Sequence, residues 1–347
     1  MIRIGINGFG RIGRAITRII LQSDDCELVV INELDPDIKN LVYLLKHDSI
    51  YGRFHKEVTI DMENRSISFN GRKIKIYSIS KTDEIPWEDH DIDVLIDATG
   101  VNANVKASHH LIKRGVPKVI ITHSPPISDV DITLVMGANE SHYNPKQHHV
   151  VSSSICDATA IAPLLFEINN IWGIDACFVT TLHPWLSYQN LLDGSVGSVS
   201  SPGHFWKDYS IGRSSVLNLI PKDTTAAAAV IKVLPDLKGK LDAISFRVPT
   251  NIVSASDITI ALNSKTSAAQ INEHIKTLSQ RGDNVFELQE DHLVSSDHLG
   301  TNKSVIVDAN RTKVIDGRMV KMIAWYDNEW GYSYKTVEIA RLLAKKL

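Results

Sequence analysis

The stretch Ile2-Arg3-Ile4-Gly5-Ile6-Asn7-Gly8-Phe9-Gly10-Arg11-Ile12-Gly13-Arg14 decides how the first half of the chain folds. An apolar strand runs into three glycines spaced G-x-G-x-x-G, and an apolar helical pattern follows over residues 15–21. Gly8 permits a tight turn, Gly10 lets the backbone approach a pyrophosphate, and Gly13 lets helix and strand pack closely. The free N–H groups of the helix start then suit an anion. The stretch therefore predicts a dinucleotide-binding strand, turn and helix.

An acidic residue strengthens this prediction. The apolar run Glu27-Leu28-Val29-Val30-Ile31 ends at Asn32-Glu33, about 20 residues after the glycines, where an acid can hydrogen-bond both ribose hydroxyls. Glu33 also repels a 2′-phosphate, so it favours NAD over NADP. The alternative interpretation is a solvated loop acid.

Further strands alternate with helical patterns along residues 1–151. Residues 93–97 end at Ala98-Thr99-Gly100, a strand end where cofactor loops gather in doubly wound sheets. We expect a helix over 105–114, strands over 118–122 and 133–137, and a hairpin within 58–77 that turns at Asn70-Gly71. The pattern predicts an α/β fold that begins with a Rossmann-type doubly wound sheet.

The pattern changes from Ser152 onward. A helix over 160–171 precedes long alternating strands over 176–182, 243–248, 253–262 and 319–326, which is typical of a mostly antiparallel sheet in an α+β domain. The polar segment 194–210 predicts an exposed loop. We expect a NAD-binding domain over 1–151, a catalytic domain over 152–328, and a C-terminal segment over 329–347 whose helix returns to the first domain.

Composition limits the partners and the cellular compartment that we expect for the protein. The 347 residues carry a net charge of -3, so no electrostatic attraction to nucleic acid or anionic membrane is expected. No apolar run approaches the ~20 residues of a membrane span, and the first residues read as a strand rather than a signal peptide. The cysteines Cys26, Cys156 and Cys177 have neither disulfide nor zinc spacing. We therefore expect a cytoplasmic protein without a bound metal.

Cys156 and His183 are the candidate catalytic residues. Cys156 directly precedes the predicted helix, and His183 ends the strand over 176–182. A cysteine at a helix start, with a histidine downstream and a nucleotide fingerprint upstream, indicates covalent catalysis joined to hydride transfer. The alternatives are a buried structural thiol and a core histidine.

Several segments together resemble one family. They are the glycine stretch 6–14, Leu234-Pro235 with Leu237-Lys238-Gly239-Lys240-Leu241, Phe246-Arg247-Val248-Pro249-Thr250, and Trp325-Tyr326-Asp327-Asn328-Glu329-Trp330-Gly331-Tyr332. The chain resembles the glyceraldehyde-3-phosphate dehydrogenase family from Met1 to its C-terminal helix. Asn32-Glu33-Leu34 and Thr122-His123-Ser124-Pro125 are closer to the erythrose-4-phosphate dehydrogenase branch.

The resemblance implies a reaction and an assembly. A small phosphorylated aldehyde would form a thiohemiacetal with Cys156, which NAD-dependent oxidation converts to a thioester, with His183 as base. The family is usually a homotetramer in which a long loop lies against a neighbouring subunit's cofactor. Asn328 falls where the family orients the nicotinamide carboxamide, and Arg247 at a substrate-phosphate position. The helix start and an imidazolium would lower the pKa of Cys156.

We assign the remaining site residues on the same basis. The cofactor-binding candidates are Gly8, Gly10, Arg11, Ile12, Gly13, Glu33, Thr99, Gly100, Thr122, Asn328 and Tyr332. The substrate-binding candidates are Arg247, Thr224, Thr225 and Arg213.

The catalytic loop departs from the family pattern. The family writes Ser-Cys-Thr-Thr-Asn where this chain has Ile155-Cys156-Asp157-Ala158-Thr159. Ile155 offers no donor for the inorganic phosphate that cleaves the thioester, and Asp157 brings a like charge and should raise the pKa of Cys156. The phosphate element Ser-Thr-Gly is here Asp223-Thr224-Thr225. Leu186 replaces a threonine hydroxyl on the substrate side, where added aromatic bulk favours a less anionic or differently shaped aldehyde.

Three functions remain open from the sequence. The first is an enzyme like glyceraldehyde-3-phosphate dehydrogenase that still uses phosphate, held by Thr224, Thr225 and Arg213. The second is an aldehyde dehydrogenase with an altered substrate and water or another acceptor in place of phosphate, as in the erythrose-4-phosphate dehydrogenase branch. The third is a catalytically silent NAD-binding homologue.

Overall fold

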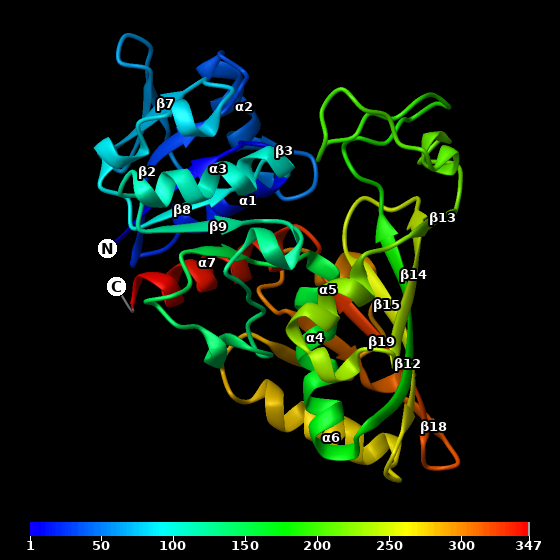
Figure 1. Ribbon diagram of the computed structural model, residues 1–347. Coiled ribbons are helices and arrows are strands. Elements are labelled where there is room, and N and C mark those ends of the chain that lie inside the picture. The colour runs from blue at the N-terminus through cyan, green and yellow to red at the C-terminus, as the bar shows by residue number, and fades with distance from the viewer. Residues whose placement is uncertain (346–347) are drawn as a thin grey trace. The chain divides into compact units, whose positions relative to one another are not determined.

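The computed structural model describes residues 1–345, which form two compact units. One unit comprises Met1–Leu134, His142–Ser153 and the chain from Thr336 onward, and the other comprises Val135–Ser141 and Ser154–Lys335. Figure 1 traces the chain through both. Among the described residues, no helix is both long and apolar enough to cross a membrane.

The first unit is built on a nine-stranded sheet. Its order is β10-β11-β9-β8-β1-β2-β7-β6-β5, and all pairs from β10 to β7 are parallel. β1 lies inside the sheet with later strands on both sides, which confirms the doubly wound prediction. The strands are β1 (Ile2–Asn7), β2 (Cys26–Asn32), β5 (Thr59–Asp61), β6 (Ser66–Phe69), β7 (Arg72–Tyr77), β8 (Val94–Asp97), β9 (Lys118–Ile121), β10 (Ile132–Thr133) and β11 (Val150–Ser152). A separate ribbon pairs β3 (His47–Asp48) with β4 (Gly52–Arg53).

Helices connect these strands. They are α1 (Arg11–Ile20), α2 (Ile38–Lys46) and α3 (Asn102–Lys113). The hairpin β6–β7 turns at Asn70 and Gly71, both at positive φ, as the sequence predicts. The strand expected over 133–137 is wrong beyond Thr133, because Gly137 takes φ +85° and the amide of Ala138 donates to the carbonyl of Val135 in a turn.

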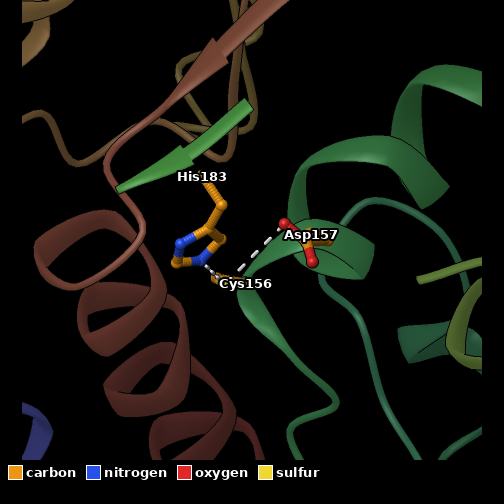
Figure 2. Close-up of side chains that lie close together, drawn as sticks. All are labelled: Cys156, Asp157 and His183. Atoms are coloured by element: carbon orange, nitrogen blue, oxygen red, sulfur yellow. Dashed lines mark hydrogen bonds between the residues drawn. The ribbon is translucent and has the colours of Figure 1, made fainter. Parts of the chain in front are cut away.

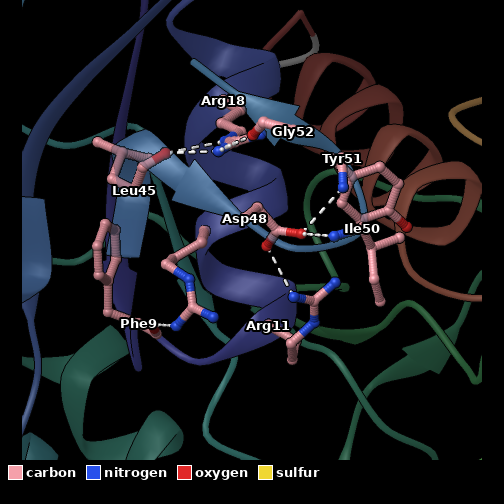
Figure 3. A network of polar contacts seen from close by, with 9 residues as sticks. Phe9, Arg11, Arg18, Leu45, Asp48, Ile50, Tyr51 and Gly52 are labelled. Atoms are coloured by element: carbon pink, nitrogen blue, oxygen red, sulfur yellow. Dashed lines mark hydrogen bonds and ion pairs between the residues drawn. The ribbon is translucent and has the colours of Figure 1, made fainter. Parts of the chain in front are cut away.

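A polar network fixes the start of α1 (Figure 3). The Nη1 atom of Arg11 lies 2.7 Å from Oδ2 of Asp48, whose other oxygen accepts from the amides of Ile50 and Tyr51. Arg18 donates to the carbonyl of Leu45. These contacts tie α1 to the last turn of α2 and to the chain after it, next to the glycine turn.

The second unit is built on an eight-stranded sheet with the order β13-β14-β12-β15-β19-β17-β16, and β18 pairs with β19. Only the pairs β12–β14 and β16–β17 are parallel among these described strands, which confirms the mostly antiparallel prediction. The strands are β12 (Ile174–Pro184), β13 (Ile220–Asp223), β14 (Leu241–Val248), β15 (Ser254–Leu262), β16 (Phe286–Gln289), β17 (Val305–Asp308), β18 (Lys313–Ile315) and β19 (Met319–Tyr326).

The helix α4 (Cys156–Trp172) packs against this sheet, next to α5 (Ala226–Val233) (Figure 1). Leu164 and Leu165 of α4 are fully buried, and so are Ile258 and Ile260 of β15 in the same core. Truncating such a leucine to alanine costs about 2–5 kcal/mol. This buried helix carries Cys156 at its first residue, so the core of the unit fixes the position of the thiol.

The remaining elements complete the chain. They are α6 (Ala268–Ser279), α7 (Trp330–Ala344) and the short 3-10 helices Thr82–Glu84, Trp87–His90, Ile127–Asp129, Glu140–His142, Tyr209–Gly212, Pro235–Leu237, Ser295–His298 and Ala309–Arg311. The segment 194–210 is an irregular loop with one bridge between Gly197 and Phe205, as predicted. In the first unit, Nε of Arg341 on α7 donates to Asp25 at 2.8 Å.

Candidate active site

An unusual backbone turn positions Cys156. Ser154 adopts φ +61°, a left-handed conformation that costs a non-glycine residue about 1–3 kcal/mol. Its carbonyl accepts a hydrogen bond from the hydroxyl of Tyr332 at 3.2 Å. Ile155 is extended and provides no side-chain cap, and Cys156 begins α4. The first-turn amides of the helix consequently have no partner within the helix and are available near the thiol.

His183 lies at the end of β12 and faces Cys156 (Figure 2). Its Nε2 atom is 3.5 Å from Sγ of Cys156, and its Nδ1 atom is 2.8 Å from the carbonyl oxygen of Pro184. A carbonyl only accepts, so Nδ1 carries the proton in the neutral ring and Nε2 is left as the acceptor. The histidine is thus held in the tautomer that can take a proton from the thiol.

Asp157 is the third member of this group (Figure 2). Its Oδ1 atom lies 4.0 Å from Sγ of Cys156 and accepts a 2.5 Å hydrogen bond from the hydroxyl of Tyr326. The carboxylate is buried in the first turn of α4, where the helix dipole favours a negative charge. The first turn of α4, which an external anion would approach, therefore already carries a negative charge of the chain itself.

The electrostatics keep both catalytic candidates neutral. Burial raises the pKa of Cys156 well above its ordinary value, and the charge of Asp157 adds to this, while Arg247 and the first-turn amides oppose it. Burial and the charge of Arg247 lower the pKa of His183 to about 4. The sequence predicted that a charged His183 lowers the pKa of Cys156. This prediction is wrong for the resting site, where His183 is neutral. The expected rise caused by Asp157 is confirmed.

Cysteine, aspartate and histidine could also ligate a metal. The ligand atoms of Cys156, Asp157 and His183 lie within 4.8 Å of one another, and these residue types bind Zn²⁺. The hydrogen bond from Tyr326 already occupies Oδ1 of Asp157. Among the described residues, Oδ2 of Asp157 has no such bond, so the carboxylate still offers one oxygen. Cys156 and His183 also pair a thiol nucleophile with a base, which is the chemistry that the nucleotide fingerprint favours.

Arg247 stands beside His183 in the sheet. The two residues are register partners on the parallel strands β14 and β12, and the guanidinium is buried. Its Nη2 atom donates to the hydroxyl of Tyr188 at 3.4 Å. The predicted substrate-binding residue Arg247 and the predicted base His183 therefore share one face of the sheet.

The other substrate-binding candidates lie in different settings. Nε of Arg213 donates to Asp193 at 2.8 Å in an exposed ion pair of the loop. The hydroxyl of Thr224 accepts from the amide of Ala226, and Thr225 directly precedes α5. Arg213 is thus already paired with Asp193 on the surface, whereas Thr224 and Thr225 lie at the start of α5.

Four cofactor candidates of the first unit line a cavity of about 280 Å³. Gly8, Gly10, Glu33 and Thr99 line it, together with Asn7, Asn32, Leu34, Ser80, Ala98, Val101 and Asn104. Gly8 takes φ +92°, and a Cβ atom on Gly13 would come within 2.0 Å of the carbonyl oxygen of Gly8. A Cβ atom on Gly10 would meet nothing within 4 Å, so the backbone there borders open space that a pyrophosphate fits.

Hydrogen bonds organise the walls of this cavity. One carboxylate oxygen of Glu33 accepts from the amide of Phe9 at 2.6 Å, which links the acid to the glycine turn. The buried carboxylate of Asp97 accepts from Asn7 and from the hydroxyl of Thr99. Burial raises the pKa of Asp97 against these hydrogen bonds. The cavity is therefore pre-organised rather than formed by mobile side chains.

The remaining predicted cofactor residues have identifiable surroundings. Gly100 is at φ +71°, the hydroxyl of Thr122 donates to the carbonyl of Asp97, and Ile12 lies in α1. In the second unit, Oδ1 of Asn328 is buried without a hydrogen-bond partner among the described residues. An orphaned amide oxygen suits a ligand that donates to it, as a nicotinamide carboxamide does.

The sequence alone could not reveal the role of Tyr326. It lies within the quoted motif over 325–332, but its partner Asp157 is 169 residues away in the chain. No local spacing connects the two. Their contact follows from the packing of α4 on the sheet that contains β19.

Comparison with known proteins gives two matches to family models. Residues 2–105 match the glyceraldehyde 3-phosphate dehydrogenase NAD binding domain, and residues 155–328 match the C-terminal domain of the same enzyme.

Curated relatives match along the whole chain. Glyceraldehyde-3-phosphate dehydrogenase 2 from Nostoc sp. is 38% identical and covers 100% of this chain and 99% of its own length. The glyceraldehyde-3-phosphate dehydrogenase of Geobacillus stearothermophilus is 37% identical, with 99% of each chain covered. The Atriplex nummularia enzyme of that name is 40% identical, over 99% of this chain and 92% of its own.

Proposed function

Since the chain belongs to the glyceraldehyde-3-phosphate dehydrogenase family, we propose that it oxidises a small phosphorylated aldehyde through a thioester on Cys156. The observation that carries the proposal is the 3.5 Å approach of Sγ of Cys156 to an Nε2 atom of His183 that is free to accept a proton. The chain is an oxidoreductase of this family, and NAD is its cofactor. We assign NAD binding to residues 1–151 and catalysis to residues 152–328.

The residues that hold NAD follow from the cavity of the first unit. The backbone at Gly8, Gly10 and Gly13 would receive the pyrophosphate, with Arg11 and Ile12 opening the helix. Glu33 would bind the ribose hydroxyls, and Thr99, Gly100 and Thr122 would border the cofactor. Asn328 would accept from the carboxamide, and Tyr332 would support the loop at Ser154. When bound, NAD accepts the hydride that leaves the substrate carbon.

Catalysis begins from a neutral thiol and a neutral imidazole. As Sγ of Cys156 bonds to the aldehyde carbon, Nε2 of His183 takes the thiol proton and returns it to the former carbonyl oxygen, which gives a thiohemiacetal. When the hydrogen on carbon departs as hydride, His183 takes the hydroxyl proton and the carbonyl of the thioester forms. A histidine that is neutral at pH 7 can serve as base at once, because its pKa is about 4.

The fate of the thioester separates the first two candidate functions. Asp157 and Ile155 favour an acceptor other than inorganic phosphate, because a buried carboxylate stands 4.0 Å from Sγ where a phosphate dianion would have to approach. Water is the simplest such acceptor, and it would release a carboxylic acid and the free thiol. The phosphorylating alternative would rely on Thr224 and Thr225 beside α5.

An aldehyde panel tests the proposal. NADH formation is measured with glyceraldehyde 3-phosphate, erythrose 4-phosphate and their unphosphorylated counterparts, with and without inorganic phosphate. We expect oxidation of a phosphorylated aldehyde. Absence of NADH with every aldehyde, in a protein that binds NAD, would instead support the silent homologue.

We also propose a homotetramer. Phe178 and Ile244 leave large apolar side chains exposed on one face of the sheet, as do Leu191, Leu192 and Tyr209 in the chain after β12. Such surface is typical of contacts between subunits. Light scattering on the purified protein should give the mass of four chains, and a monomer mass would contradict the assignment.

A further inference from the structure

Lys222 shares the sheet face that carries His183 and Arg247. His183 is the register partner of Arg247 across β12 and β14, and Lys222 is that of Ser245 across β13 and β14. Register partners project to the same face, and so do residues two apart on one strand. Lys222 is therefore the diagonal neighbour of Arg247, at a backbone separation of about 7–8 Å that long side chains can bridge.

Two aromatic rings join these cations into one group. Nζ of Lys222 lies 5.1 Å from the ring centroid of Trp206. Trp206 stacks on Tyr188 at 6.1 Å with an interplanar angle of 16°, and the hydroxyl of Tyr188 accepts from Arg247. We call Tyr188, Trp206, Lys222 and Arg247 the cation–aromatic cluster.

The cluster holds positive charge without an acidic partner. Within residues 1–345, neither Lys222 nor Arg247 forms an ion pair, and Nζ of Lys222 donates to the backbone carbonyl of Asp223 at 2.8 Å. Burial lowers the pKa of Lys222, and the charge of Arg247 lowers it further, against the opposing charges of Asp208, Asp223 and Asp157. The charges of Lys222 and Arg247 repel each other, and an anion bound between them would offset this repulsion.

Buried donors around the cluster also lack acceptors. Nε of Arg247, Nε1 of Trp206 and Nε2 of Gln189 are buried without a hydrogen-bond partner in the described chain. Each unsatisfied buried donor costs about 1–3 kcal/mol. A ligand rich in acceptor oxygens would remove this cost, and a phosphate group offers several acceptor oxygens together with a charge near -2.

We propose that Lys222 is a specificity-determining residue that binds the phosphate group of the aldehyde together with Arg247, against the wall formed by Tyr188 and Trp206. The inference rests on the proposed function and adds a residue of this chain that selects the phosphorylated aldehyde at that site. From the sequence, the added aromatic side chains favoured a less anionic or differently shaped aldehyde. The structure supplies the missing attraction from Lys222, on a strand two positions along the sheet from His183.

The same chemistry could come from free phosphate, so the kinetic test has two arms. Lys222→Met is compared with wild type on glyceraldehyde 3-phosphate and on glyceraldehyde, at several concentrations of inorganic phosphate. Lys276→Met is the matched control, because Lys276 belongs to the same unit and pairs with Glu290 on the surface. We expect the preference for the phosphorylated aldehyde to fall by about tenfold to a hundredfold in Lys222→Met, as for a lost charged hydrogen bond.

The other outcomes of this kinetic test either support a phosphate contact by Lys222 or overturn it. Lys222→Arg should restore most of the preference, and Lys276→Met should not alter it. A rise in the KM for inorganic phosphate with an unchanged aldehyde preference would assign the cluster to free phosphate and overturn the proposal. An equal loss of activity with both aldehydes in Lys222→Met would show that Lys222 has only a structural role and would also overturn the proposal.

A binding experiment separates this inference from the proposed function. Glycerol 3-phosphate carries the same phosphate ester but no aldehyde, and its ³¹P NMR line broadening reports binding without turnover. Broadening by wild type and Lys276→Met but not by Lys222→Met supports the site even if no aldehyde is oxidised. Equal broadening by all three proteins, or none by wild type, would refute it.

Discussion

The turns that lead into α1 and α4 have similar backbone geometry but are built from different residues. Each contains one residue at positive φ, Gly8 at +92° and Ser154 at +61°, and each helix start lacks a side-chain cap. Both helices therefore begin with amides that have no acceptor within the helix itself, at the positive end of a dipole. By backbone alone, both are suited to an anion.

The charge of the first turn makes the difference. The first turn of α1 contains no acid, and a Cβ atom on Gly10 would meet only open space. The first turn of α4 contains the buried Asp157, bound by Tyr326. An acid in the first turn repels an external anion that the same helix start would otherwise attract. We expect α1 to receive the cofactor pyrophosphate and α4 to disfavour free phosphate.

The largest effect on turnover should come from replacing the nucleophile Cys156 at the start of α4, which leaves the turn at α1 unchanged. Cys156→Ser should lower kcat by at least about a thousandfold, because a serine hydroxyl is a far weaker nucleophile than a thiolate. The NAD dissociation constant, measured by titration calorimetry, should change less than twofold. Cys26→Ser is the control in the other unit. Substantial turnover by Cys156→Ser would rule out the thioester route.

Two glycine variants test the α1 turn. In Gly13→Ala the new methyl would lie 2.0 Å from the carbonyl of Gly8, so the turn must shift, and we expect a loss of about 1–3 kcal/mol in unfolding free energy. In Gly10→Ala the methyl meets no protein atom, so the melting temperature should stay while NAD binds about tenfold more weakly. Thermal unfolding with and without NAD measures both. Unweakened NAD binding by Gly10→Ala would place the pyrophosphate elsewhere.

Glu33 should set cofactor choice at the α1 side. Glu33→Gln keeps an acceptor for the amide of Phe9 but removes the charge that repels a 2′-phosphate. The preference for NAD over NADP should fall by about tenfold, as expected for one close pair of like charges. Asp35→Asn is the control for a general loss of negative charge. Equal affinities of the wild-type protein for NAD and NADP would contradict the role of Glu33.

Asp157 should have a smaller effect on thiol reactivity. The pKa of Cys156 is raised, so the thiolate fraction, and with it the rate of alkylation by iodoacetamide, should increase steadily between about pH 6 and 9. Asp157→Asn removes a charge that raises this pKa, so its rate at pH 7 should be several-fold higher. Tyr326→Phe keeps the charge and should give no increase. A rate in wild type that is already constant from about pH 6 would indicate a thiolate–imidazolium pair instead.

Local patterns made much of the fold predictable. The glycine spacing, the strand alternation and the Asn70-Gly71 turn are set by neighbouring residues, and the doubly wound and antiparallel sheets follow from them. Gly137 ended a predicted strand early because one residue at positive φ outweighed the apolar pattern.

The site was harder to predict because its electrostatics depend on distant residues. The sequence identified Cys156, His183 and Arg247 as candidates and indicated that Asp157 raises the pKa of the thiol. It could not show that burial keeps His183 neutral, that Tyr326 donates to Asp157, or that the register of β13 and β14 makes Lys222 the diagonal neighbour of Arg247. The assigned roles of these residues stay predictions until the variants are measured.

The most direct measurement is the dependence of NADH formation on inorganic phosphate at saturating aldehyde and NAD. We expect a weak dependence without saturation at low millimolar phosphate in wild type, because Asp157 places a negative charge in the first turn of α4. We expect a stronger dependence in Asp157→Thr, which removes the charge and adds a hydroxyl. A steep, saturable dependence in the wild-type protein would contradict the proposed effect of Asp157 and identify an ordinary phosphorylating enzyme.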